Sequence, residues 1–184
     1  MDFLDHWVQT TKKVSFDPVE FYRLSDRYEG LKFPLKYTFV SGLIMGLIFS
    51  ILTIIGGILG GDFSVTTIIS SPVTILTGGL FMVSMVASTT LIQHLFIKLM
   101  GGSNWRGTAK IISYASGPTA LVGWIPLLGQ IFILYLYYNG IKTVHGFSKK
   151  KAIIVLVLPY LAIGILIVLV SVLLGGLLFS MLLG

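Results

Sequence analysis

Three histidines and several serines are the side chains that could do acid–base or nucleophilic chemistry in this chain. A serine hydrolase acting inside a membrane needs a serine and a histidine at the same depth. Ser113 and Ser116 lie within an apolar segment. The histidines lie beside basic segments instead, at His6, His94 and His145. The sequence has no HExxH motif and no cysteine. We therefore expect no catalytic residue, no metal site and no cofactor, and predict that the protein is not an enzyme.

Carboxylates in the middle of an apolar segment could couple solute movement to protons or sodium ions. The chain has seven Asp and Glu residues. Six of them precede the first long apolar segment, and the seventh, Asp62, lies in a turn between two such segments. His94 stands one helical turn before Lys98, at a segment end. The sequence therefore favours a protein without an ion-coupled transport site.

Hydroxyl and amide groups are the remaining candidates for a polar site. Thr77 and Ser84 belong to one apolar segment, and Tyr114 and Gln130 belong to the two that follow. Such groups usually form hydrogen bonds within their own helix or with a neighbouring helix. The alternative is a polar cavity for a lipid or small solute, lined by these four residues.

The elements that position these residues follow from the composition. Hydrophobic residues make up 55% of the 184-residue chain, charged residues make up 11%, and the mean hydropathy is +0.93. Because a soluble domain with a polar surface does not have this composition, we predict an all-α, multi-pass integral membrane protein. The formal charge of +6 comes from basic residues beside the apolar segments, which indicates contact with lipid headgroups rather than nucleic acid.

Five apolar segments are long enough to cross a membrane as helices. We place them at about residues 35–59, 68–96, 106–123, 126–142 and 151–174, as a five-helix transmembrane bundle within residues 35–184.

Residues 1–34 form a predicted cytoplasmic segment. In it Asp17 stands as an N-cap, Pro18 as the first helical residue and Glu20 as the capping-box partner. We therefore expect a short amphipathic helix that continues to about Tyr28 and lies on the membrane surface. An ordinary helix packed on protein is the alternative.

Glycine and proline indicate where helices meet and break. Gly42 and Gly46 lie four residues apart, and such small residues let another helix approach closely, either in the same chain or in a dimer. Pro118 should bend the third apolar segment, Pro126 lies in the break after it, and Pro159 lies near the start of the fifth. Each bend leaves a carbonyl that needs a partner inside the bundle.

Lysine and arginine are confined to alternate connecting segments. All thirteen lie in the N-terminal segment, between the second and third apolar segments, or between the fourth and fifth. The positive-inside rule makes these segments cytoplasmic, so the N-terminus is inside, the C-terminus is outside, and the number of crossings is odd. The residues predicted to meet anionic lipid headgroups or a protein partner are Lys142, Lys149, Lys150, Lys151, Arg106 and Lys110.

A central block of the chain has a distinctive order of features: Arg106, the YASGP run from Tyr114 to Pro118, Pro126, and the HGFSKKKA turn. With FDPVEFYRL and GLKFPLKYTFV upstream, it resembles the Yip-domain family of Ypt/Rab-GTPase-interacting membrane proteins, in its bacterial and archaeal branch. The resemblance covers the chain from about Asp17 to Pro159. It implies a five-span bundle and a cytoplasmic N-terminus, and for eukaryotic members a role in vesicle traffic and organelle membrane shape. For eukaryotic members it also implies binding of prenylated small GTPases.

The chain lacks the acidic Asp-Leu-Tyr-Gly-Pro stretch of eukaryotic members, so a small GTPase is not the leading predicted partner. We expect a non-enzymatic protein that organises membrane or scaffolds partners, with homo- and hetero-oligomers both open. Its location would be the cell membrane of a prokaryote, or the Golgi and ER of a eukaryote. A small permease or lipid-handling protein with a polar cavity is the alternative.

Overall fold

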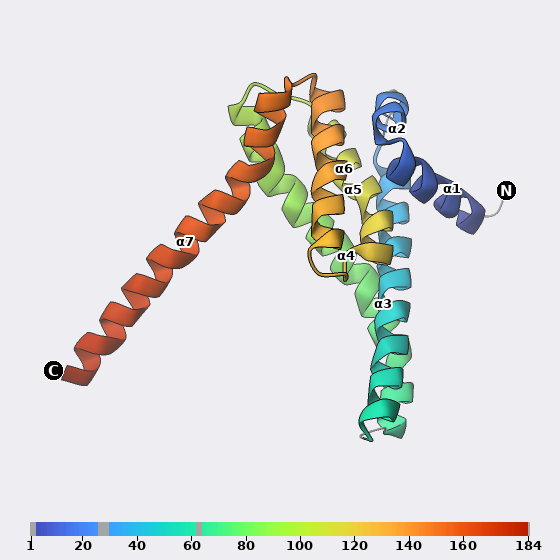
Figure 1. Cartoon of the computed structure of the whole chain (residues 1–184), viewed down its shortest axis with the longest axis vertical. Helices are drawn as coiled ribbons and strands as arrows, with labels where there is room; N and C mark the ends of the chain where they lie inside the picture. Colours follow the sequence, from blue (N-terminus) through green and yellow to red (C-terminus); the bar gives the residue numbers. More distant parts are fainter. Residues whose placement is uncertain (1–2, 26–29, 62–63, 184) are drawn as a thin grey trace.

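The computed structural model describes residues 3–25, 30–61 and 64–183. This part of the chain is all-helical (Figure 1). Its helices are α1 (Phe3–Phe16), α2 (Pro18–Ser25), α3 (Lys32–Gly60), α4 (Val65–Leu99), α5 (Trp105–Val122), α6 (Leu128–His145) and α7 (Lys149–Leu183). The shorter helices gather at one end of the long α3 and α4, and α7 starts at that end and then diverges (Figure 1).

Helix α2 begins where the capping residues indicate. The Asp17 carboxylate accepts a hydrogen bond from the backbone N–H of Glu20 (Oδ1 to N, 3.3 Å), and Pro18 is the first helical residue. The last is Ser25, and Tyr28 lies outside the described residues.

Helix α1 is an addition to the predicted elements. It packs on α5 and α2, and its buried side chains also reach α3, where Trp7 Nε1 donates to Ser41 Oγ over 3.0 Å and the hydroxyls of Thr11 and Tyr37 lie 2.7 Å apart. The Trp7 and Tyr37 rings are also stacked. Because the partners in these contacts lie in α3, the sequence of α1 itself, in which polar and apolar residues are mixed, does not predict them.

Helices α3 and α4 approach closely at the predicted glycines. A Cβ added to Gly42 would collide with the backbone of Gly78 and Gly79, and one added to Gly46 would lie 2.8 Å from the Cα of Ile75. A larger side chain at either position would push the helices apart. The structure therefore uses this glycine face for packing within one chain.

A tight turn at Pro126 separates α5 from α6. Leu127 has φ 63° and ψ −57°, and the N–H of Leu128 donates to the carbonyl of Pro126 over 2.7 Å. This is a γ-turn, a strained conformation for a residue with a Cβ. Each helix has 18 residues, or about 27 Å at 1.5 Å per residue.

Pro159 deprives a carbonyl of its helical partner, and α4 supplies another. A proline has no N–H to give to the carbonyl four residues earlier, here that of Val155. Gln93 Nε2 donates to this oxygen over 2.8 Å. Val155 and Pro159 are buried against the bundle, whereas all described side chains of α7 from Tyr160 onward are exposed.

Three helices in the described part of the chain are long and apolar enough to cross a membrane, namely α3, α4 and α7 as far as Leu174. Helices α5 and α6 are shorter and less apolar. The structure thus supports a membrane protein with several spanning helices, and five crossings remain a prediction. Since α5 and α6 form a pair that returns to its starting end (Figure 1), three and five crossings predict the same sides for the termini.

Candidate functional site

Most of the predicted headgroup-binding residues surround the end of the bundle where α5 starts, α6 ends and α7 starts. Arg106, Lys149 and Lys150 are exposed, and Lys142 and Lys151 are half-buried. The Nζ of Lys151 also lies 4.4 Å from the centre of the Phe147 ring. These positions are consistent with a surface that meets anionic headgroups.

Lys110 lies elsewhere than predicted. Its side chain is only 5% exposed, and its Nζ donates to the backbone carbonyl of Ser25 over 3.1 Å. The lysine therefore helps to hold the end of α2 against α5, instead of lying exposed on the headgroup-facing surface. Its neighbours in the sequence could not reveal this, because α2 reaches it from 85 residues away.

Two histidines that are distant in the sequence meet at one hydroxyl. Thr108 Oγ1 lies 3.0 Å from His94 Nδ1 and 3.1 Å from His145 Nε2. These two contacts join α4, α5 and α6. A hydroxyl donates one hydrogen bond, so bonding both rings requires an N–H from at least one imidazole. The described residues include no group of three His, Cys, Asp or Glu that could hold a metal. The sequence placed both histidines at segment ends, but it carried no signal for Thr108.

A groove of about 1140 Å³ lies beside the N-terminal helices, which are themselves packed on the bundle. It lies between α1, α2, the first turns of α3 and the first half of α5. Its ionisable lining residues are His6, Lys13, Asp17, Glu20, Lys32, Lys36 and Lys110. Sequence reasoning missed this site because α1 was not among the expected elements.

Aromatic rings form part of the groove wall. The Tyr114 ring centre lies 4.9 Å from that of Phe21 and 6.3 Å from that of Phe33. Nearby, the Tyr22 hydroxyl donates to the carbonyl of Ile111 over 3.2 Å. Burial raises the pKa of Tyr22 well above its usual value, so this phenol remains a neutral donor. The groove thus combines lysines with an apolar aromatic wall. The hydrogen bond of Tyr22 holds α2 on α5 beside this wall.

The sequence model of the Yip1 domain matches residues 12–181. The chain belongs to the Yip1 domain family. This match takes in α2 to α6 completely, together with parts of α1 and α7. It confirms the family indicated by the central block of the sequence. No curated protein and no solved structure is similar enough to the chain to count as a match.

The four residues proposed for a polar cavity are dispersed in this Yip1 family member. Thr77 and Ser84 are exposed on α4 and donate to the carbonyls of Val73 and Leu80 in their own helix. Gln130 donates to the carbonyl of Gly123 over 3.1 Å, at the turn between α5 and α6. Tyr114 lines the groove described above.

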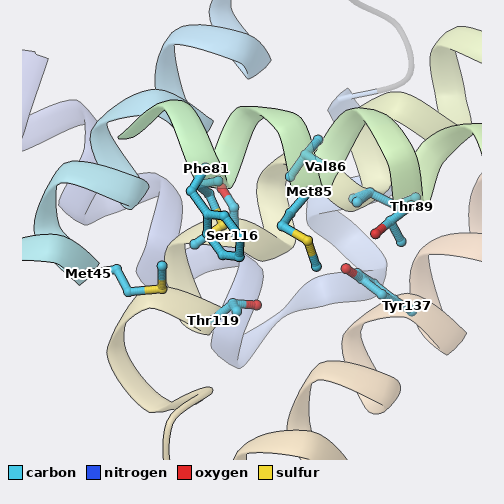
Figure 2. A pocket seen from close by; sticks show the side chains of 10 residues that line it. Met45, Phe81, Met85, Val86, Thr89, Ser116, Thr119 and Tyr137 are labelled. Atoms are coloured by element: carbon cyan, nitrogen blue, oxygen red, sulfur yellow. The ribbon is translucent and has the colours of Figure 1, made fainter. Parts of the chain in front are cut away.

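A second cavity lies where α3, α4, α5 and α6 meet and has a volume of about 160 Å³. Figure 2 shows Met85 beside the hydroxyl ends of Thr89 and Tyr137, with Met45 and Thr119 farther along the cavity. Sites for drug-sized ligands usually have volumes of about 300–1,000 Å³. In this Yip1 protein the groove at the N-terminal helices is therefore the better candidate for a binding site.

Proposed function

We propose that this Yip1-family chain organises membranes without catalysing a reaction, because it is wider in one leaflet than in the other. The distribution of buried residues carries the proposal. Among the described side chains, none is buried after Ser50 in α3, before Gly79 in α4, or after Pro159 in α7. We call the part that contains the buried residues the broad end and the remainder the narrow end.

The two ends differ in the number of helices that fill them. Helices α1, α2, α5 and α6 all contribute buried residues to the broad end, together with segments of the three long helices. The narrow end contains the remote halves of α3 and α4 and the diverging part of α7 (Figure 1). A protein that occupies more area in one leaflet expands that leaflet, so it is most stable where the leaflet is convex.

The charge pattern supports an orientation for this wedge. Every described lysine and arginine belongs to the broad end. By the positive-inside rule the broad end would face the cytoplasm, and the protein would favour membrane that bulges toward the cytoplasm. This shape is consistent with the trafficking or shaping role that the family resemblance implies for eukaryotic members.

Curvature sorting in a vesicle tests the proposal. The labelled full chain is reconstituted into giant vesicles, and a thin membrane tube, whose outer leaflet is convex, is pulled from each. Molecules with the broad end outward should be enriched on the tube at least about twofold, and molecules with the opposite orientation should be depleted. Equal density on tube and vesicle for both orientations would contradict the proposal.

A lipid-handling protein is the second candidate function. It is favoured by the groove between the N-terminal helices and the bundle, which is large and combines charged with aromatic lining residues.

A further inference from the structure

We propose that the groove binds one anionic glycerophospholipid, with its phosphate at the lysines and an acyl chain on the aromatic wall. This inference specifies the ligand of the lipid-handling candidate and rests on that candidate. It does not depend on the wedge shape. The volume of about 1140 Å³ exceeds that of usual small-ligand sites, which suits a ligand as large as a lipid.

The described charges of the groove favour an anion. Lys13 of α1 and Lys32 and Lys36 of α3 are exposed around it, and all three line it. The two described carboxylates in the lining are already engaged. Asp17 caps α2 by accepting the N–H of Glu20, and the Glu20 carboxylate binds Arg23. Lysines at a membrane surface attract anionic headgroups.

The apolar wall favours a lipid over a soluble anion. Phe21, Phe33 and Tyr114 come from α2, α3 and α5, and their rings form a continuous surface along the groove. Phe21 and Phe33 remain half-exposed on this surface. A free phosphate would leave Phe21 and Phe33 uncovered, whereas an acyl chain would bury them.

Helix α1 forms one wall of the groove, through His6, Gln9, Thr10 and Lys13. Trp7 is bonded to Ser41, which lies nine residues (41 − 32) after Lys32 in α3. At 1.5 Å per residue this is about 13 Å along the helix. The contact between Trp7 and Ser41 therefore holds the α1 wall on α3 beyond the lining residues Lys32, Phe33 and Lys36.

Native mass spectrometry with defined lipids tests the proposal. The purified full chain is titrated with phosphatidylglycerol, with phosphatidylcholine, and with inorganic phosphate as the soluble arm. We expect one phosphatidylglycerol to bind preferentially, and Lys13→Gln/Lys32→Gln to weaken that binding by about tenfold or more, at about 1 kcal/mol per lysine. The matched control, Lys12→Gln/Lys98→Gln, removes the same charge at exposed positions outside the groove lining and should change the affinity by less than about twofold.

The proposal is overturned if the two double variants lose affinity equally, if neither loses it, or if inorganic phosphate displaces the lipid. A photoactivatable acyl chain gives an independent readout in the unmodified protein. Labelling should concentrate on peptides containing Phe21, Phe33 or Tyr114, and labelling confined to α7 would refute the site. Because the tube-sorting assay does not involve the groove, either proposal can fail without the other.

Discussion

Gln93 and Pro159 are complementary residues on two helices that are otherwise mostly apolar. A carbonyl without a partner in hydrocarbon has no water to bond, so the missing N–H of Pro159 has to be replaced by another donor. Gln93 Nε2, at 2.8 Å from the Val155 oxygen, is that donor. The contact fixes α7 on α4 at the last buried turn before α7 diverges.

At the residue scale we predict that Gln93→Leu destabilises the protein by about 1 kcal/mol, because it leaves the Val155 carbonyl unpaired. In a Pro159→Ala background the restored N–H can bond the same carbonyl, so the cost of Gln93→Leu should fall toward zero. The free energies of unfolding of the unsubstituted protein, the two single variants and the double variant give the coupling energy between Gln93 and Pro159. Equal costs in both backgrounds would show that the hydrogen bond does not replace the helical one.

A second residue-scale prediction concerns the γ-turn. Leu127→Gly should raise the free energy of unfolding by about 1 kcal/mol, because glycine tolerates a φ of 63°. Leu128→Gly is the matched control, since the two side chains have similar exposures of 76% and 70% but Leu128 begins α6. The control should lower stability by up to about 1 kcal/mol. A loss for Leu127→Gly as large as that of the control would mean that the turn is unstrained.

At the scale of the element, the α3–α4 pair depends on the absence of side chains at its crossing. The carbonyl of Gly78 and the Cα of Ile75 occupy the space where a Cβ of Gly42 or Gly46 would lie. Backbone atoms cannot move aside as the end of a flexible side chain can. The two long helices therefore form a close pair, which supports both ends of the molecule.

We expect Gly46→Val to destabilise the protein by about 1–3 kcal/mol through this overpacking. Gly56→Val provides the control, because it lies in the same helix with no heavy atom within 4 Å of its Cβ position. Thermal unfolding in detergent compares the two variants, and light scattering reports the oligomeric state. If Gly46→Val instead dissociated an oligomer without loss of monomer stability, the glycine face would serve association between chains.

At the scale of the whole molecule, the basic residues and the packed helices lie at the same end. The lysine-bearing end is also the end where all the helices pack, so under the proposed function the orientation in the membrane would decide which leaflet is widened. Removal of the basic residues that begin α7 should therefore disturb both topology and lipid contact.

We predict that Lys149→Gln/Lys150→Gln/Lys151→Gln places the C-terminus in the cytoplasm in a measurable fraction of molecules, because α7 loses the basic residues that the positive-inside rule assigns to the cytoplasmic side. A C-terminal reporter measures that fraction, and salt-sensitive enrichment of anionic lipid around α7 should fall in parallel. Lys12→Gln is the control, since it lies outside the groove lining and several basic residues remain in the N-terminal segment. If topology and lipid enrichment were both unchanged, these lysines would have no role in anchoring α7 or in binding anionic lipid.

The sequence alone determined the local features of this protein. Asp17 and Pro18 predicted the start of α2, Pro126 predicted the turn after α5, and the apolar lengths predicted α3, α4 and α7. Each of these depends on neighbouring residues or on composition, which a single chain displays. The family also followed from the sequence, because its pattern lies in one continuous block.

Only the tertiary structure decided which helix faces meet. An amphipathic helix shows which side turns inward, but α4 and α7 are apolar on every side and give no such direction. Thr108 between two histidines, Lys110 at the end of α2 and Gln93 at Val155 all depend on contacts between distant segments. The groove depends in addition on α1, whose place is set by hydrogen bonds to α3 that no local pattern encodes.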